Sequence, residues 1–220
     1  MNTELARFNM IEQQIRPWEV LDASVLSLLS VVRREDFVPP LHRAMAFVDM
    51  QVPLGAGQSM LEPKVEARLL QELQLKRHEK VLEIGAGSGF MAALLAHRAM
   101  QVHTLECRPA LAAMARENLR LAGVVNAMVV EVDAAAGARG LPKEGPFDAI
   151  VLSGSVASVP QALLLQLKPG GRLVAVVGAE PIMRACLYTR AGDAAWAQAE
   201  LFDTVAQRLE GFAEPARFHF

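Results

Sequence analysis

The sequence predicts an α/β fold, with a doubly wound and mostly parallel sheet that follows a helical N-terminal segment. Three observations lead to this prediction. Strand-like segments alternate with helix-like segments over residues 78–178, a glycine-rich turn follows the first of these strands, and acidic residues stand at the ends of consecutive strands. Alternating strands and helices are joined by crossover connections, which give a parallel sheet covered on both faces.

The composition fits one globular domain. The chain has 220 residues, of which 52% are hydrophobic, and this is enough for a sizeable core. It contains no Ser/Gly/Pro-rich stretch long enough to link two domains. We therefore expect a single domain over residues 1–220. Its parts are an N-terminal helical segment (1–75), a core (78–178) and C-terminal strands (182–220).

Charge and cysteine content argue against several classes of protein. With 22 basic and 24 acidic residues the net charge is −2, which argues against nucleic-acid binding. Cys107 and Cys186 form no CxxC motif and are expected to be reduced thiols of a cytoplasmic protein. The five histidines are scattered, so no metal site is expected. The N-terminus lacks the features of a signal peptide, and apolar runs fall far short of the roughly 18 residues that a membrane span needs.

Helical periodicity predicts two helices in the N-terminal segment. Apolar residues recur with helical spacing over residues 18–32, where Asp22 is a plausible cap. A second helix is expected over residues 63–75, with Pro63 in its first turn. Between them, residues 37–58 contain too much Pro and Gly for regular structure, so we expect a loop with short strands.

The core is predicted to alternate five strands with three helices. The strands are expected over residues 80–85, 101–107, 127–133, 147–154 and 171–178, and the helices over residues 90–98, 109–123 and 158–167. The helix over 109–123 has Pro109 at its start, Gly123 at its end and apolar residues on one face. Two further strands are expected over residues 183–191 and 196–205.

The glycine-rich turn "VLEIGAGSGF" (residues 81–90) discriminates between cofactors. The dinucleotide fingerprint GxGxxG needs a small residue five positions after its first glycine. Counting from Gly85, that position holds the large Phe90, and the third glycine comes one residue early, at Gly89. No GK[ST] follows, which excludes a P-loop. The turn therefore fits neither phosphate-binding pattern.

A carboxylate stands just ahead of this turn. Glu83 precedes Gly85 by two residues, at the carboxyl end of the strand. An acid there would repel a pyrophosphate but would attract the ammonium of a methionyl group through charge-assisted hydrogen bonds. S-adenosylmethionine carries an ammonium and a sulfonium and has no phosphate, so the pattern favours it over NAD.

Two further acids end the next two strands. Glu106 closes "HTLEC", where an acid suits the two ribose hydroxyls; the alternative is a solvated surface residue. Asp133 closes "VVEVD", where it could accept from the adenine amino group or could cap the helix that begins at "AAAG". Ligands bind at the carboxyl ends of the strands in open parallel sheets, which is where all three acids are expected.

The order of these motifs resembles class I S-adenosylmethionine-dependent methyltransferases, which have a Rossmann-like fold. The resemblance rests on "VLEIGAGSG", "LEC", "VD", "PFDAIVLSG" and "LKPGGRLVAVVG". The flanking stretches "RREDFVPP" and "AFVDMQVPLGAGQSMLEP" further resemble protein-L-isoaspartate O-methyltransferases. That family methylates the abnormal isoaspartyl carboxylate of aged proteins. The resemblance therefore implies S-adenosylmethionine as cofactor and a protein or peptide with isoaspartyl residues as substrate.

The resemblance also implies a set of cofactor-binding residues at the strand ends and in the stretch "VPLGAGQSMLEP" (residues 52–63). This stretch is expected to fold over the cofactor, although it could be an ordinary surface loop. The expected cofactor-binding residues are Gln58, Ser59, Glu83, Gly85, Ala86, Gly87, Ser88, Gly89, Glu106, Cys107, Asp133 and Ala134.

Three stretches depart from the family pattern. Where the family reads "GQTISQP" this chain reads "GQSMLEP", so the family's serine aligns with Leu61 and its threonine with Ser59, our candidate catalytic hydroxyl. Residues 151–155 read "VLSGS" instead of "VTAAP", and residues 217–220 read "RFHF" where the family has an "RFVPL"-like strand. Three functions remain open: isoaspartyl methylation, methylation of a different small-molecule or protein acceptor, and cofactor binding without turnover. Oligomeric state cannot be predicted.

Overall fold

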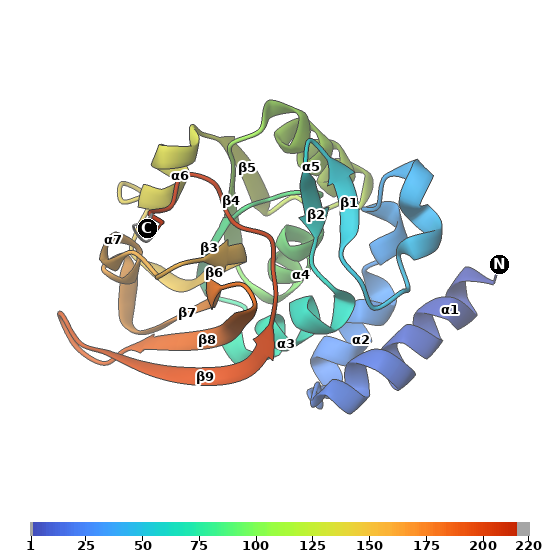
Figure 1. Ribbon diagram of the computed structural model, residues 1–220, viewed down its shortest axis with the longest axis horizontal. Helices are drawn as coiled ribbons and strands as arrows, with labels where there is room; N and C mark the ends of the chain where they lie inside the picture. The colour runs from blue at the N-terminus through green and yellow to red at the C-terminus, as the bar shows by residue number, and fades with distance from the viewer. Residues whose placement is uncertain (1, 215–220) are drawn as a thin grey trace, which may run out of the picture.

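A seven-stranded sheet with helices on both faces organises the chain in the computed structural model, which describes residues 2–214 (Figure 1). The strand order is β5-β4-β3-β6-β7-β8-β9. The first five strands in this order are parallel, and the last two pair antiparallel. The strands are β3 (Lys80–Ile84), β4 (Gln101–Glu106), β5 (Ala127–Glu131), β6 (Phe147–Val156), β7 (Leu167–Ala179), β8 (Ile182–Arg190) and β9 (Trp196–Thr204).

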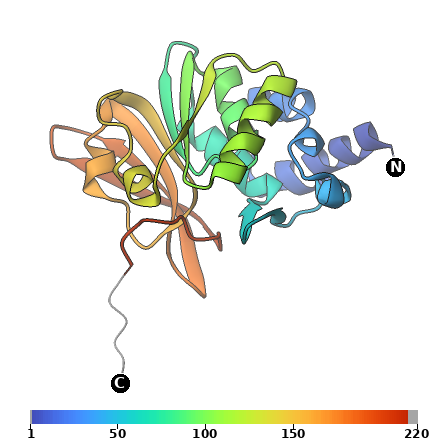
Figure 2. The same cartoon turned by 90° about the horizontal axis from the view of Figure 1, so that it is seen from above.

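The helices form two layers around this sheet. Figure 2 shows the blue to green helices gathered on one side and the yellow and orange helices on the other. The helices are α1 (Thr3–Met10), α2 (Ala23–Val31), α3 (Pro63–Leu73), α4 (Phe90–Arg98), α5 (Pro109–Leu121), α6 (Ala134–Arg139) and α7 (Gln161–Leu164). Short helical turns extend the N-terminal part over Ile11–Ile15, Arg16–Trp18, Arg34–Asp36 and Pro40–Met45.

Alternate residues of the central strands supply two separate cores. In β3, Val81 belongs to the core under α2 to α5, while Leu82 and Ile84 belong to the core under α6 and α7. The same alternation places Val151 in the first core and Ile150 in the second. Strands buried on both faces read as nearly continuous apolar runs, which explains "KVLEI" and "FDAIVL". The predicted α/β architecture is confirmed.

Local sequence signals place the N-terminal helices. The Asp22 side chain accepts a 2.8 Å hydrogen bond from the Ser24 amide, so α2 begins at Ala23 and not at residue 18. Pro63 opens α3, where its missing N–H is not needed. The loop between these helices contains a small antiparallel hairpin of β1 (Val52–Gly55) and β2 (Gln58–Met60), as the Pro and Gly content of this stretch predicts.

The structure differs from the sequence predictions in one connection. The helix expected over residues 158–167 is confined to α7, because Pro160 precedes it and β7 begins at Leu167. The short helix α6 follows Asp133, in agreement with the alternative that this residue caps a helix beginning at "AAAG". The "RFHF" stretch lies outside the described residues. In residues 2–214 we find no helix that is both long and apolar enough to cross a membrane.

Candidate functional site

A cavity lies at the carboxyl ends of β3, β4 and β6, beside the hairpin β1–β2. Its volume is about 760 Å³ when the part open to solvent is included. Parallel sheets of this type bind ligands at this edge, where the strand order reverses on either side of β3. The cavity is lined by Leu54, Gln58, Ser59, Met60, Leu61, Glu66, Glu83, Ile84, Gly85, Ala86, Gly87, Ser88, Phe90, Met91, Leu105, Glu106, Cys107, Arg108, Leu111, Val132, Ala134, Gly137, Ser153, Leu209 and Glu210.

The glycine-rich turn forms the floor of this cavity. The amides of Gly85 and Ala86 both donate to the Leu105 carbonyl, at 2.9 and 3.0 Å, which fixes the turn against β4. Gly85 has a φ of +95°, a conformation that side chains with a Cβ rarely adopt. Gly89 has a φ of +85°, and a Cβ there would lie 3.2 Å from the backbone of Ala115. Gly89 therefore permits α4 and α5 to approach each other and does not line the cavity.

Glu83 is fully buried at the end of β3 and lines the cavity. Its two carboxylate oxygens accept hydrogen bonds from the hydroxyls of Ser153 (2.6 Å) and Thr104 (2.7 Å). Burial raises the pKa of Glu83 to about 8, while the two hydroxyls act in the opposite direction. A cation in the cavity would favour the ionised carboxylate, so this site is suited to a positively charged group.

Glu106 lies in the adjacent strand end, 6% exposed. One of its oxygens accepts a 2.8 Å hydrogen bond from the Gly87 amide, and the other accepts from the amides of Cys107 and Arg108 at 2.9 and 3.0 Å. These three bonds hold the carboxylate in one orientation above the turn. Each carboxylate oxygen has two lone pairs, so the group can still accept from ligand hydroxyls.

A buried ion pair lies at the back of the cavity. The guanidinium of Arg34 pairs with the carboxylate of Glu66, and also donates a 2.6 Å hydrogen bond to the Leu61 carbonyl. The Arg34 guanidinium carbon lies 5.0 Å from the centre of the Phe90 ring. Burial raises the pKa of Glu66 to about 7 against the opposing effect of Arg34. The pair ties the end of the hairpin to α3 and α4.

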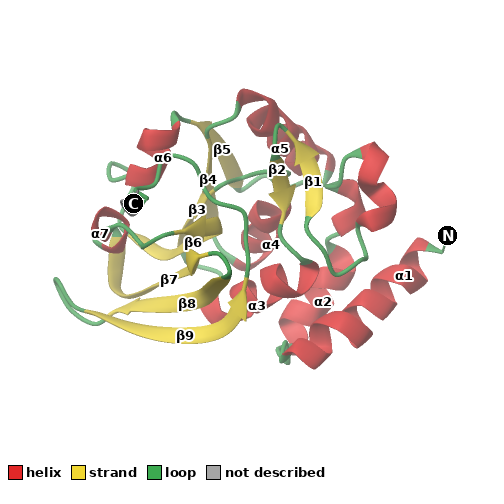
Figure 3. Ribbon diagram, viewed as in Figure 1, coloured by secondary structure: helices red, strands yellow, loops and turns green. Residues whose placement is uncertain are grey.

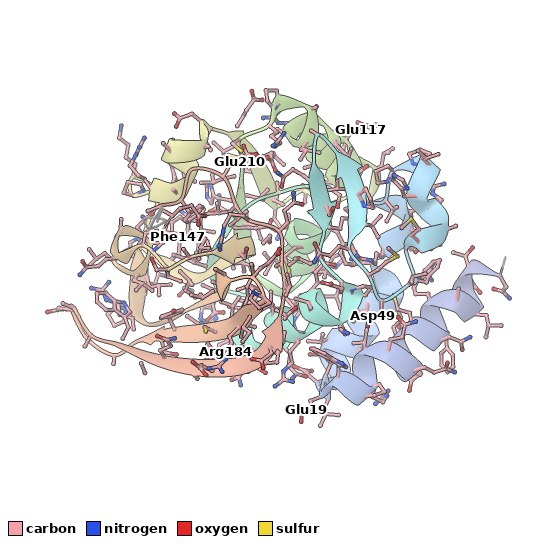
Figure 4. The ribbon with its side chains drawn as sticks, in the orientation of Figure 1. Glu19, Asp49, Glu117, Phe147, Arg184 and Glu210 are labelled. Carbon is pink, nitrogen blue, oxygen red and sulfur yellow. The ribbon has the colours of Figure 1, made fainter. Side chains whose placement is uncertain are left out.

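Three contacts to Glu210 close the outer side of the cavity. Glu210, labelled in Figure 4, forms an ion pair with Arg108. The side-chain amide of Gln58 donates to the Glu210 carboxylate at 3.4 Å, and the Cys107 thiol lies 3.8 Å from the same carboxylate. These contacts bring the hairpin, the residues that follow β4 and the loop that follows β9 together around one opening.

Ten of the twelve expected cofactor-binding residues line the cavity, and Gly89 and Asp133 are the two that do not. Asp133 caps α6 by accepting a 2.7 Å hydrogen bond from the Ala136 amide. Sequence reasoning missed Glu66, Arg108, Ser153, Leu209 and Glu210 as lining residues. Their place depends on contacts between distant parts of the chain, so no local signal marks them. Among residues 2–214, no group of three His, Cys, Asp or Glu side chains could hold a metal ion.

Comparisons with known proteins agree on one family. Residues 6–205 match the profile of the family described as protein-L-isoaspartate(D-aspartate) O-methyltransferase (PCMT). A protein-L-isoaspartate O-methyltransferase from Methanoculleus marisnigri is 43% identical over 172 residues, which cover 78% of this chain and 77% of the relative. Protein-L-isoaspartate O-methyltransferase 2 from Marinobacter nauticus is 41% identical over 195 residues, which cover 88% of each chain.

A solved structure supports the fold over nearly the whole chain. It is a Plasmodium falciparum protein assigned as a protein-L-isoaspartate O-methyltransferase, in complex with S-adenosyl-L-homocysteine. The TM-score is 0.79 at 19% identity, and the match covers 96% of this chain and 99% of that one.

Proposed function

The chain belongs to the protein-L-isoaspartate(D-aspartate) O-methyltransferase family, and we propose that it methylates the free carboxylate of isoaspartyl residues in peptides and proteins. As a member of this family it is an S-adenosylmethionine-dependent methyltransferase. The observation that carries the proposal for this chain's own site is the buried Glu83 carboxylate beside the glycine-rich turn.

The charges of the cavity suit a cationic nucleoside without phosphates. Among the residues that the structure describes, four carboxylates line it, those of Glu66, Glu83, Glu106 and Glu210. Within the same described part of the chain, Arg108 is the only Lys or Arg that lines the cavity, and it is already paired with Glu210. A pyrophosphate would meet carboxylates with no free cation to balance it, whereas an ammonium and a sulfonium would be attracted.

Each part of the site then has a role toward S-adenosylmethionine. Glu83 would hold the ammonium and Glu106 the ribose hydroxyls, while Gly85 and Gly87 allow the ligand to approach the backbone closely. Gln58 and Ser59 would contact the ligand from the hairpin. The bound cofactor supplies a methyl group on a positively charged sulfur, which is a good leaving group.

The acceptor needs little chemical help from the protein. A carboxylate is already ionised at pH 7, so a strong general base is unnecessary. The main tasks of the chain are to position the carboxylate in line with the methyl group and to exclude water, and orientation alone can supply up to about 7–11 kcal/mol in the best-oriented systems. The apolar wall of Leu54, Met60 and Leu61 supports the exclusion of water.

Leu61 favours one alternative, methyl transfer to a different acceptor. Its side chain is 3% exposed and lines the cavity at the position where the family pattern has a serine. The hydroxyls of Ser59 and Ser153 line the same cavity and could contact an acceptor carboxylate. Of the two, Ser59 remains our candidate for the catalytic hydroxyl.

A paired-peptide assay tests the proposal. The protein is incubated with S-adenosylmethionine carrying a labelled methyl group, and with two peptides that differ only in Asp or isoAsp at one position. We expect label in the isoAsp peptide alone, in a form that base hydrolyses as a methyl ester does. Equal labelling of both peptides, or of neither while S-adenosylhomocysteine still binds, would contradict isoaspartyl specificity.

We further propose a cytoplasmic location, which suits the free thiols of Cys107 and Cys186.

A further inference from the structure

Strand β5 forms one end of the seven-stranded sheet, where its only strand neighbour among the described residues is β4 (Figure 3). The other edge of β5 therefore carries backbone groups without a strand partner. Such an edge is a template for another strand, and proteins commonly protect it with Pro, Lys or a bulge. The β5 sequence "AMVVE" contains neither Pro nor Lys, and its register with β4 is regular. This edge is therefore suited to pairing with a second chain.

The register with β4 identifies the backbone groups on the outer edge of β5. The Val102 amide in β4 donates to the Asn126 carbonyl at 2.9 Å, so Asn126 directs its backbone groups toward β4. Successive residues of a strand direct their N–H and C=O groups to opposite edges. The residues that direct them outward are therefore Ala127, Val129 and Glu131. The exposed Arg116 guanidinium of α5 agrees with this assignment, because it lies 3.5 Å from the Val129 carbonyl.

Large apolar side chains are exposed beside this edge. Val125, just before β5, is 95% exposed, Leu121 at the end of α5 is 67% exposed, and Met128 within the strand is 52% exposed. Strand β9, at the other end of the sheet, differs in this respect. Its exposed residues are Ala197–Glu200 and Asp203, which are all small or polar. Because gathered apolar surface marks interaction sites, the β5 edge is the better candidate for a contact with another chain.

The charges along this edge suit a second copy of the same chain. Glu131, at the carboxyl end of β5, lies 3.6 Å from Arg116. Because α5 joins two parallel strands, it runs antiparallel to β5, and Arg120, one turn after Arg116, lies toward Ala127 at the amino end. Arg120 pairs at the surface with Glu117 of its own helix, which Figure 4 labels. The edge thus has an acid at one end and an arginine at the other, and two antiparallel copies bring these opposite charges together.

We propose that two copies of the chain form a symmetric dimer in which their β5 strands pair antiparallel about a two-fold axis at Val129. Val129 then lies opposite Val129 of the second copy, and Ala127 lies opposite Glu131 of the second copy. Each outward N–H thereby meets an outward carbonyl, so the unpaired groups of both edges are satisfied. Because the same contact is made in both directions, the assembly closes at two copies.

Side chains on both faces of the joined sheet support this register. Met128 shares a face with Val130, which packs against the core under α6 and α7, and the register places Met128 opposite Val130 of the second copy. On the other face, Arg120 approaches Glu131 of the second copy. The axis is perpendicular to the sheet, so the carboxyl ends of the strands point in opposite directions in the two copies. Each cavity therefore stays open to a protein substrate, and the dimer does not depend on the identity of the methyl acceptor.

Charged substitutions on the two outermost strands test this dimer. Met128→Lys places a protecting charge on the β5 edge, and Ala199→Lys places the same charge on β9 as the matched control. Sedimentation velocity of the wild type and both variants measures the dissociation constant over the micromolar range, and hydrogen exchange measures each β5 amide separately. Neither residue lines the cavity. The calorimetric affinity of both variants for S-adenosylhomocysteine should therefore equal that of the wild type, which shows that they are folded.

We expect a wild-type dimer that Met128→Lys weakens at least about tenfold and that Ala199→Lys leaves unchanged. In the wild type, exchange of the outward amides of Ala127, Val129 and Glu131 should slow as the protein concentration rises. The Met128 amide, which faces β4, should exchange slowly throughout. A wild type that stays monomeric, or a dimer that withstands Met128→Lys, would overturn the proposal. Absence of S-adenosylhomocysteine binding by the wild type would instead contradict the proposed function and leave the sedimentation result unaffected.

Discussion

The hydroxyl of Ser153, at the end of β6, donates a 2.6 Å hydrogen bond to the buried carboxylate of Glu83 in the neighbouring strand β3. This bond favours the ionised carboxylate and so lowers the pKa of Glu83, whereas burial and the nearby carboxylates of Glu66 and Glu106 raise it. The balance leaves the pKa at about 8 in the absence of ligand. The protonation of Glu83 is thus sensitive to what enters the cavity.

Cofactor affinity should therefore depend on pH. An ammonium ligand binds to ionised Glu83, so affinity for S-adenosylhomocysteine should rise from pH 6 to about pH 8, by at most about tenfold per unit. Ser153→Ala removes the donor and should shift this rise to higher pH, so that the loss of affinity is largest below about pH 8, where Glu83 is mainly protonated, and disappears at higher pH. Calorimetry at several pH values measures both effects, and an affinity that is flat from pH 6 to 8 would contradict the role of Glu83.

The same pKa predicts how the stability of the ligand-free protein changes with pH. The pKa of Glu83 is raised to about 8 from its ordinary 4.5, so between these values the unfolded chain has lost a proton that the folded chain retains. The free energy of unfolding must fall as the pH rises through this window. The Gln side chain of Glu83→Gln cannot ionise. We therefore expect the free energy of unfolding of this variant to equal that of the wild type near pH 4.5 and to exceed it at pH 8. Thermal unfolding at both pH values tests this, with Asp193→Asn as an exposed control.

The buried pair of Arg34 and Glu66 should be costly to break. Arg34→Met leaves the Glu66 carboxylate buried without its partner and removes the hydrogen bond to the Leu61 carbonyl. We expect a loss of about 3–5 kcal/mol in the free energy of unfolding. The double variant Arg34→Met/Glu66→Leu should recover most of this loss, because no buried charge remains. Urea unfolding of the wild type, the single variant and the double variant measures these differences in stability. Equal stability of the single and double variants would argue against the pairing of Arg34 with Glu66.

The hairpin β1–β2 should contribute directly to cofactor binding. Gln58→Ala and Ser59→Ala each remove a polar group that lines the cavity, and each should weaken S-adenosylhomocysteine binding about fivefold, as expected for one hydrogen bond. Pro53→Ala, an exposed change in the same hairpin, serves as the control. If calorimetry finds the affinity unchanged in both serine and glutamine variants, the hairpin does not contact the cofactor.

Local patterns in the sequence were sufficient to predict the core of the fold. The strands around Glu83 and Glu106 end where their apolar runs end, and the helix-start signals, the Asp22 cap and Pro63 in the first turn, act over two or three residues. These signals depend on residues that are close in the chain, so they can be recognised without knowing the fold. The predicted position of the glycine-rich turn at the carboxyl edge of the sheet followed from the same local information.

The contacts that complete the site could not be predicted in this way. Ser153 meets Glu83 from a strand 70 residues away, and Arg34 meets Glu66 from a separate helical turn. Residues 151–155 could be recognised only as a departure from the family pattern, because their partners, residues 206–209, become neighbours only after folding. Such pairings are set by packing, and a single sequence does not encode them locally.

The lining of the cavity draws on residues from Leu54 to Glu210, a range that spans more than two thirds of the chain. During synthesis the chain leaves the ribosome from its N-terminus, so the glycine-rich turn and the acidic strand ends are released well before Leu209. A nascent chain therefore cannot form the complete cavity until Leu209 and Glu210 have also left the ribosome. Methyl donor in the surrounding solution can stabilise the folded chain, but a chain that still lacks these residues cannot offer it the full set of contacts.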